Sequence, residues 1–202
     1  MVRLLCIKII PGTGGINRSN QGRAVSISYD SIYIAESGIY NGSYGFCWIF
    51  KFNGTTWVQQ GPKLFPLNPV GTSVFGQSIS ISNGVLAVGG YNDDNGMGAV
   101  WIYGNVNNVW SQQAKIIGTG NIGNASQGIS VSLSGDGSVL AYGGNTDNSN
   151  IGATWIFTLS GGVWTQQVKL VGTGNAGICY QGASVSLSGD GNTVAVGAPV
   201  DN

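Results

Sequence analysis

Apolar residues alternate with serine in four short runs that recur along the chain. The runs span 25–28, 79–82, 131–134 and 185–188, and each follows a glycine: Gly22, Gly76, Gly128 and Gly182. An alternation with a period of two predicts a strand with one buried face. The turns after the last three runs read Ser-Asn-Gly or Ser-Gly-Asp-Gly, and Asn-Gly and Asp-Gly accept the positive φ angles of tight hairpins. The pattern therefore predicts four β-hairpins.

Two further strands complete the repeat. A Gly/Asn/Asp loop after each hairpin leads to a third strand, and a short turn leads to a fourth. The third strands lie at 45–50, 98–103 and 152–157, and the fourth strands at 57–64, 110–117 and 164–170. No segment keeps a helical period, so we expect almost no helix. Each unit is thus a four-stranded antiparallel meander of about 53 residues.

A meander of this size cannot bury both of its faces alone, whereas stacked copies can. Radial stacking of four-stranded sheets gives a β-propeller of four to eight blades. A linear β-solenoid is the alternative, but its coils usually repeat in far fewer residues. We therefore predict an all-β fold, a β-propeller built from four-stranded antiparallel blades.

The blades are predicted at about 21–64, 74–117 and 127–171, with a partial blade at 181–202. A lone strand at 4–10 matches the fourth strand of a preceding blade. The chain is then a single propeller segment of about 3.75 blades, an incomplete ring in which the last blade lacks its third strand. We expect a segment of a longer protein, or a protomer that self-association completes into a ring.

Tryptophan and lysine follow the repeat. Trp48, Trp101 and Trp155 share one column, and Trp57, Trp110 and Trp164 share another. Because these rings recur in every unit, they are interpreted as structural positions that fill the space between blades, not as a ligand-stacking site. Lys8, Lys63, Lys115 and Lys169 fall in the fourth strand, where edge lysines discourage pairing with another chain.

Charged residues make up only 8% of the chain, with eight basic and eight acidic side chains. This balance gives no preference for nucleic acid or for an anionic membrane. No apolar stretch is long enough to span a membrane, and the opening MVRLLCIKII shows no signal-peptide cleavage site. Cys6, Cys47 and Cys179 share no repeat position, so we expect free thiols and no disulfide framework or zinc site.

The inventory of side chains argues against catalysis. The chain has no histidine, and Glu36 is its only glutamate, so histidine-based triads are excluded. A carboxylate pair for glycoside hydrolysis stays formally open. The glycine-rich segment at 118–123 lacks the Lys-Ser/Thr of a phosphate loop and recurs at 172–177. It is therefore a connection between blades, and we predict no enzyme and no catalytic residue.

The string G-x-S-V-S-L-S-G-D-G-N-T-V-A-V-G-A-P, ending at Pro199, resembles the FG-GAP repeat of integrin-α-like propellers. The following GAxWIF…GxWxQQxKL pattern is similar to the bacterial and viral branch of that repeat. The likeness is strongest over 121–202, and the first copy is degenerate, with Ala24 in place of a serine and Glu36-Ser37 in place of two small residues. The resemblance implies a propeller for adhesion or protein interaction, extracellular or at the cell surface.

Many FG-GAP blades bind calcium through a loop with several carboxylates, because a hard cation needs several oxygen ligands. Here the corresponding turn is Ser-Gly-Asp-Gly, and Asp136 and Asp190 supply one carboxylate each. We therefore predict no metal and no cofactor. Asp93 and Asp147, in longer loops, are weak metal candidates, and calcium is not expected to hold the protein together.

Two non-catalytic functions are consistent with these features. In the first, the chain is an interaction or adhesion scaffold that binds a protein partner through the loop-bearing face of the ring. In the alternative, it is a carbohydrate-binding propeller lectin whose blade junctions bind a glycan. The sequence does not identify the ligand-binding residues.

Overall fold

The computed structural model describes residues 12–13, 20–40, 44–174 and 177–200. Strands pair with their neighbours in sequence, and every pairing within a sheet is antiparallel. Blade 1 contains β1 (Val25–Ile27), β2 (Tyr33–Tyr40), β3 (Tyr44–Phe52) and β4 (Trp57–Gln59). Blade 2 contains β5 (Ser78–Ser82), β6 (Val85–Gly90), β7 (Ala99–Val106) and β8 (Val109–Ile116).

The second half of the chain continues the same order. Blade 3 contains β9 (Ser130–Leu133), β10 (Val139–Gly144), β11 (Ala153–Ser160) and β12 (Val163–Leu170), and blade 4 contains β13 (Ser184–Leu187) and β14 (Val194–Gly197). Two four-residue helical turns, α1 (Asp93–Gly96) and α2 (Asp147–Asn150), follow β6 and β10. The predicted all-β architecture of four-stranded antiparallel sheets is confirmed, and the number of blades in a ring stays a prediction.

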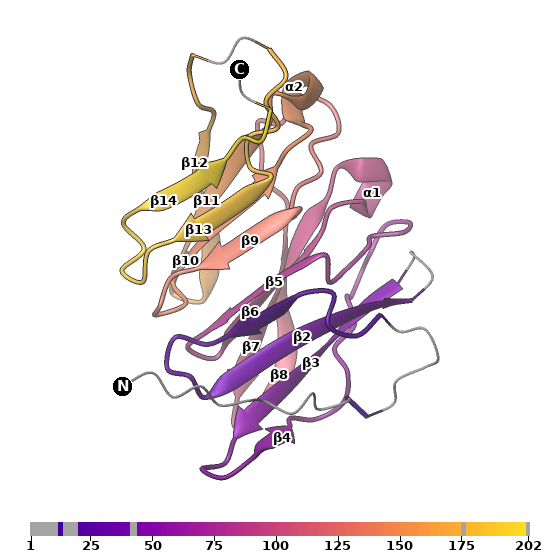
Figure 1. The fold of residues 1–202 in the computed structure, drawn as a ribbon, viewed down its shortest axis with the longest axis vertical. Coiled ribbons are helices and arrows are strands. Elements are labelled where there is room, and N and C mark those ends of the chain that lie inside the picture. The colour runs from indigo at the N-terminus through magenta and orange to yellow at the C-terminus, as the bar shows by residue number, and fades with distance from the viewer. Residues whose placement is uncertain (1–11, 14–19, 41–43, 175–176, 201–202) are drawn as a thin grey trace.

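The blades form a fan in which β1, β5, β9 and β13 run side by side along the inner edge (Figure 1). Hairpin turns lie at one end of the strands, and α1, α2 and the connections between blades lie at the other (Figure 1). No helix in the described ranges is long and apolar enough to cross a membrane. The predicted strand at 4–10, with Cys6 and Lys8, lies outside the described residues.

The hydrophobic core lies between blades, because alternate residues of a middle strand face opposite neighbours. In β6, Val88 packs toward blade 1 and Ala87 toward blade 3, and both are fully buried. Trp101 and Trp155 lie in these two clusters, and Trp48 forms a third with Phe46 and Phe50. The three Trp side chains of this column are 0% exposed.

Serine side chains of the inner strands link neighbouring blades. Ser26 Oγ accepts from Ile81 N–H at 3.2 Å, Ser80 Oγ from Leu133 N–H at 3.0 Å, and Ser132 Oγ from Leu187 N–H at 2.9 Å. The serines of the alternating runs therefore take part in the blade interface, beyond the single buried face that the sequence predicted. For the first run that prediction is wrong, because Val25 and Ile27 are 68% and 53% exposed where no described sheet covers them.

The repeated glycines receive a second set of links. Ser78 and Ser130 hydroxyls donate to the carbonyls of Gly128 and Gly182, each at 2.8 Å. Both glycines have φ near +82°, and a Cβ on Gly128 would lie 2.5 Å from the Ala99 carbonyl oxygen. Only glycine fits this conformation and this close approach.

The degenerate first copy makes the same link with a different residue. Ala24 stands where Ser78 and Ser130 stand, and the hydroxyl of its cross-strand neighbour, Ser37, donates to the Gly76 carbonyl at 2.7 Å. Glycine occupies the Ser37 position in blades 2 and 3. The two departures from the repeat therefore compensate each other.

Candidate functional site

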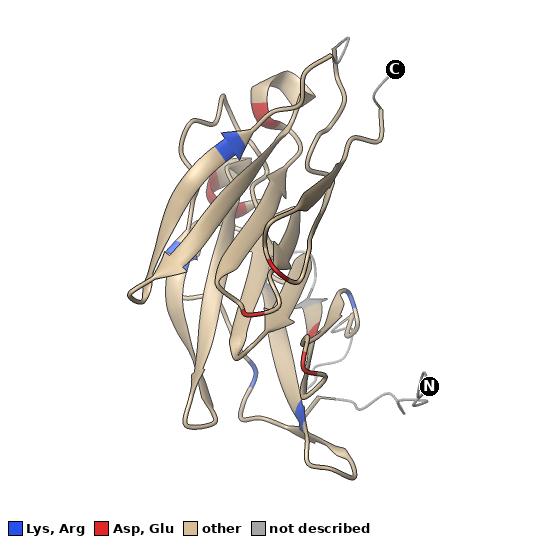
Figure 2. Ribbon diagram, turned by 90° about the vertical axis from the view of Figure 1, so that its left-hand side faces the viewer, with Lys and Arg blue, Asp and Glu red and all other residues tan. Residues whose placement is uncertain are grey.

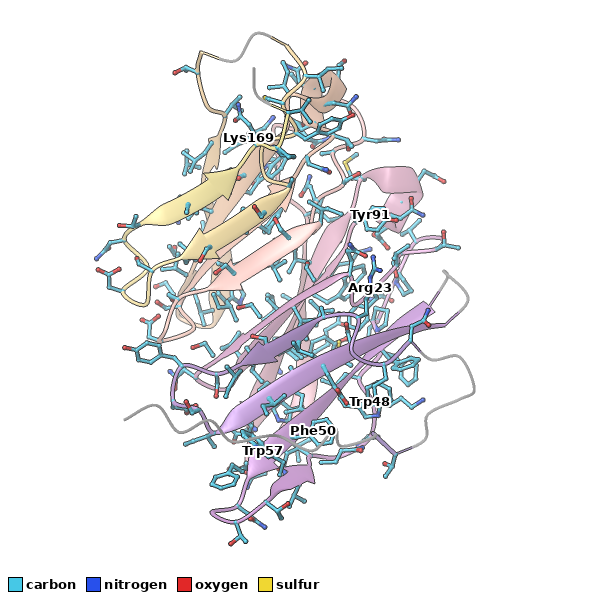
Figure 3. All side chains as sticks on the ribbon, in the orientation of Figure 1. Arg23, Trp48, Phe50, Trp57, Tyr91 and Lys169 are labelled. Atoms are coloured by element: carbon cyan, nitrogen blue, oxygen red, sulfur yellow. The ribbon has the colours of Figure 1, made fainter. Side chains whose placement is uncertain are left out.

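Two buried ion pairs in the described part of the chain join the helical turns to the outer strands. Asp93 Oδ2 in α1 lies 2.5 Å from Lys115 Nζ in β8, and Asp147 Oδ2 in α2 lies 2.5 Å from Lys169 Nζ in β12. The aspartate side chains are 0% and 1% exposed. Figure 3 labels Lys169 at the end of β12 that lies near α2. An ammonium group therefore faces each carboxylate that the sequence suggested for a metal.

Local backbone geometry presents these aspartates. The residues after Asp93 and Asp147 have left-handed φ angles, +48° at Asp94 and +49° at Asn148. Asn and Asp tolerate this conformation better than other non-glycine residues. The tight turn aims the preceding carboxylate into the protein, away from solvent.

Each carboxylate also anchors the connection that arrives from the preceding blade. Asp93 Oδ1 accepts from Val70 N–H at 2.7 Å, and Asp147 Oδ1 accepts from Ile122 N–H at 2.7 Å. Lys169 Nζ donates to the Gly120 carbonyl at 2.8 Å. Because all these partners lie on the connection, the pair fastens one blade to the next.

Tryptophan completes the anchor. Trp155 Nε1 donates to the Thr119 carbonyl at 2.9 Å, and Lys169 Nζ lies 5.3 Å from the centre of that indole ring. Trp101 and Lys115 repeat the arrangement, with distances of 3.1 Å to the Leu67 carbonyl and 5.1 Å to the ring. A cation over an indole face adds a favourable electrostatic contact.

We name this set the Asp–Trp–Lys anchor: Asp93, Trp101 and Lys115 in blade 2, and Asp147, Trp155 and Lys169 in blade 3. From the sequence, the three members were interpreted separately. The aspartates were weak metal candidates, the tryptophans filled the space between blades, and the lysines discouraged pairing of the edge strand. The signal that could have joined them is that the same intervals separate the three residues in both blades. In blade 1, Lys63 lies 4.4 Å from the centre of the Phe46 ring, and the loop at 41–43 is outside the described residues.

The other tryptophan column lies nearer the blade rim. Trp110 is 8% exposed and meets Tyr33 of blade 1 edge to face, with ring centres 5.6 Å apart. Trp57, labelled in Figure 3, packs beside Phe52 with the ring centres 5.4 Å apart, and Trp164 is partly exposed. Trp164 lines an open cavity of about 380 Å³ together with Ala114 and Ile116 of β8.

A solvent-open cavity of about 560 Å³ lies at the hairpin-turn end, between the turns of all four blades. Tyr29 is 78% exposed and stands beside Gly135 and Gly189. The sequence pattern predicted no site here. The lining residues are Tyr29, Asp30, Asn83, Gly135, Asp136, Gly189 and Asp190.

The carboxylates of Asp136 and Asp190, which line this cavity, accept hydrogen bonds from residues of their own turns. Asp136 Oδ1 accepts from the Ser134 hydroxyl at 2.6 Å and from Ser138 N–H at 3.0 Å. These hydrogen bonds lower the pKa of Asp136 to about 2, and the Ser188 hydroxyl likewise lowers the pKa of Asp190. A carboxylate with such a low pKa is a weak base at neutral pH.

Burial shifts the pKa of two further groups, Cys47 and Glu36. Burial raises the pKa of the Cys47 thiol, so the nucleophilic thiolate is suppressed. Partial burial also raises the pKa of Glu36, opposed by its hydrogen bond from Gln21. Within the described ranges, no group of three or more Cys, Asp or Glu side chains is placed to hold a metal ion. Figure 2 shows the acidic residues at separate helical turns and hairpin turns, apart from Glu36, which lies in β2.

The connections between blades expose apolar side chains at the opposite end of the strands. Val70 is 48% exposed and Ile122 is 59% exposed, although the backbone N–H of each is bonded to a buried aspartate. We call this surface the connector face; its exposed apolar residues are Phe65, Leu67, Val70, Ile117, Ile122, Val171 and Ile178.

Comparison with known proteins identifies one repeat directly. Residues 57–103 match the FG-GAP repeat model. The matched segment runs from β4 of blade 1 to β7 of blade 2, so it includes the connection, Asp93 and Trp101. No curated protein matches the sequence significantly.

The chain is similar to two solved structures. A candidate 6-phosphogluconolactonase from Bacteroides uniformis superposes with a TM-score of 0.54 and 12% identity, over 87% of this chain and 49% of that one. TolB from Acinetobacter baumannii gives a TM-score of 0.47 and 14% identity, over 85% of this chain and 36% of that one. The chain thus spans about half the length of the first structure and less of the second. At such low identity the first likeness shows the fold alone. The chain carries an FG-GAP repeat within a propeller-like, all-β fold.

Proposed function

We propose that the chain is a non-catalytic scaffold that binds a protein partner through the connector face. The observation that carries the proposal is the pairing of exposed apolar side chains with anchored backbone at Val70 and Ile122. A rigid apolar surface loses little conformational entropy on binding, so preorganisation favours association.

The FG-GAP match and the chemistry of the described residues support this function. Propellers built from FG-GAP repeats are generally non-enzymatic. Of the described carboxylates, Asp93 and Asp147 are held in buried ion pairs and Asp136 and Asp190 in their own hairpin turns, and the Cys47 thiol is buried. The low charge of the chain, 8% of residues, favours contacts through apolar and amide groups over steering by charge. We extend the proposal to an extracellular or cell-surface location, which the resemblance implies.

Site-specific photocrosslinking tests the proposal. A benzoylphenylalanine at Ile122 should crosslink a protein partner from an extract of the source cells, whereas the same group at Val109, 64% exposed beside the β7–β8 hairpin turn, should not. The matched variants L67K and V109K distinguish the two ends of the strands, because only L67K should abolish capture of that partner.

A glycan array run beside the crosslinking tests the lectin alternative. Saturable glycan binding that free sugar inhibits, and that L67K leaves unchanged, would refute a protein-binding connector face. Capture of the same protein by both crosslinker positions would refute it as well.

A further inference from the structure

The lysine of the anchor column has no aspartate partner in blade 1. Lys63 corresponds to Lys115 and Lys169, each of which lies 2.5 Å from the carboxylate of a buried aspartate. The first 92 residues contain only two acids, Asp30 and Glu36, and both accept hydrogen bonds from other side chains. Neither forms an ion pair within the described ranges. Blade 1 therefore keeps the cation of the anchor without a carboxylate of its own.

Aromatic rings surround the Lys63 ammonium group. Its Nζ atom lies 4.4 Å from the centre of the Phe46 ring, 5.7 Å from that of Trp48 and 6.0 Å from that of Phe65. Blades 2 and 3 have alanine at the Phe46 position, so blade 1 gains a ring where it lacks a carboxylate. We name Lys63, Phe46, Trp48 and Phe65 the aromatic lysine site. The rings attract the cation through their quadrupoles, but they leave its charge uncompensated.

The other described basic side chains have polar partners. Arg23 donates to Gln77 at 2.8 Å, Lys51 donates to Asn108 at 3.1 Å, and the two anchor lysines pair with aspartates. Lys63 is half-buried and has only the three rings as described partners. A charge with restricted access to water attracts an opposite charge more strongly than one in bulk water. The aromatic lysine site therefore favours an anionic group.

The surroundings of the site indicate which anion fits. Phe65 belongs to the connector face and is 52% exposed, and Leu67, two residues further along, is 59% exposed. One ammonium group matches the single charge of a carboxylate, whereas a phosphate group carries almost two charges and is better matched by several donors. The exposed apolar neighbours favour an acidic side chain that is flanked by apolar residues.

We propose that Lys63 binds the carboxylate of an Asp or Glu side chain from a protein partner that lies on the connector face. The partner's carboxylate pairs with Lys63 as Asp93 pairs with Lys115 in blade 2, and the partner's apolar neighbours pack on Phe65 and Leu67. This inference deepens the proposed function and rests on it for the source of the carboxylate.

Two short peptides test the site in the full chain without the partner. Acetyl-Leu-Glu-Leu-amide and its glutamine analogue are titrated into protein with ¹³C-labelled lysine, and NMR follows the Lys63 Cε–Hε signal and the Trp48 indole N–H signal. The Glu peptide should shift both signals and leave Lys115 and Lys169, which are already paired, unchanged. The Gln peptide should bind at least about tenfold more weakly, because it lacks the charge that the ammonium group attracts.

Three variants of the chain separate charge from packing. K63M should weaken binding of the Glu peptide at least about tenfold, followed at the Trp48 signal, whereas K63R keeps the charge and should change it less than about threefold. K51M removes another lysine that lies beside an aromatic ring, 5.5 Å from the centre of Tyr33, and should leave binding unchanged. Unaltered signals from blades 2 and 3 show that K63M is folded.

Equal binding of the Glu and Gln peptides, wild-type binding by K63M, or a response at Lys51 in place of Lys63 would overturn the proposal. Tighter binding of a phosphoserine peptide than of the Glu peptide would overturn the choice of a carboxylate. The crosslinker at Ile122 tests the proposed function separately. Capture of a protein that K63M leaves unchanged would overturn the role of Lys63 alone, whereas peptide binding without any capture would refute the protein-binding connector face and leave the carboxylate site standing.

Discussion

Replacing Lys169 by methionine removes the cation of the blade 3 anchor and keeps most of the side-chain volume. In K169M, the carboxylate of Asp147, which is 1% exposed, retains only the N–H of Ile122 as a described donor. An uncompensated buried charge is costly, and breaking a buried ion pair from one side destabilises proteins by about 3–5 kcal/mol. We expect a loss of unfolding free energy in that range.

Replacing Asp147 by asparagine has a smaller expected cost. The amide oxygen still accepts from Ile122 N–H, and Lys169, whose side chain is 16% exposed, can turn toward water. Loss of the charge-assisted contact should lower the free energy of unfolding by about 1.5–3 kcal/mol. In the double variant D147N/K169M no buried charge is left unpaired. The two changes should therefore cost less together than the sum of the single costs, with a coupling energy of at least about 1.5 kcal/mol.

Urea unfolding followed by tryptophan fluorescence measures all four proteins of this cycle. The control K51M removes a lysine whose Nζ donates to exposed Asn108 at 3.1 Å and lies 5.5 Å from the centre of the Tyr33 ring, with no carboxylate partner in the described residues. It should change stability by no more than about 1 kcal/mol. Single costs no larger than that of K51M, or strictly additive costs, would refute the anchor as a stabilising unit.

Four further predictions concern other parts of the chain. G128A should lower the free energy of unfolding by more than about 2 kcal/mol, because the strain of a left-handed residue adds to a collision with the Ala99 carbonyl. G123A, with φ +72° and open space around it, should cost about 1 kcal/mol in the same urea assay. Cys47, whose pKa burial raises, should be alkylated only at the rate of unfolding, as mapped by peptide mass spectrometry; prompt native labelling would contradict its burial. The folded-state pKa of Asp136, about 2, lies below its usual value. The wild type should therefore melt at a higher temperature than D136N at pH 5, and this difference should vanish near pH 2. A difference that persists unchanged at pH 2 would count against the prediction. Melting midpoints in chelator and in millimolar calcium should agree, and a shift of many degrees would show a metal site.

The sequence predicted the sheets because their pattern is local and repeated. Alternating serine runs, hairpin turns and the Gly-x-x-Trp third strands each specify a strand within a few residues, and three copies reinforce one another. The first copy also contained an informative departure, since Ala24 and Ser37 differ from the repeat at positions that are hydrogen-bonded across one hairpin. The structure shows that Ser37 supplies the hydroxyl that is missing at Ala24.

The anchor and the cavity could not be predicted in the same way, because they depend on which blade faces which. Lys115 reads as an edge residue from its strand, and only the packing of α1 against β8 turns it toward Asp93. Tyr29 reads as a turn residue, and only the convergence of four hairpins places it beside Gly135 and Gly189. Contacts across blades are set by geometry that no local pattern records.

Native-state hydrogen exchange at Val70 and Ile122 tests the central claim most directly, because these residues join the anchors to the connector face. If the connections are rigid platforms, both amides should exchange slowly, at rates similar to those of the strands in blades 2 and 3. Exchange as fast as that of the exposed turn at Gly161 would mean that the connections open freely, and the account of a preorganised binding face would be wrong.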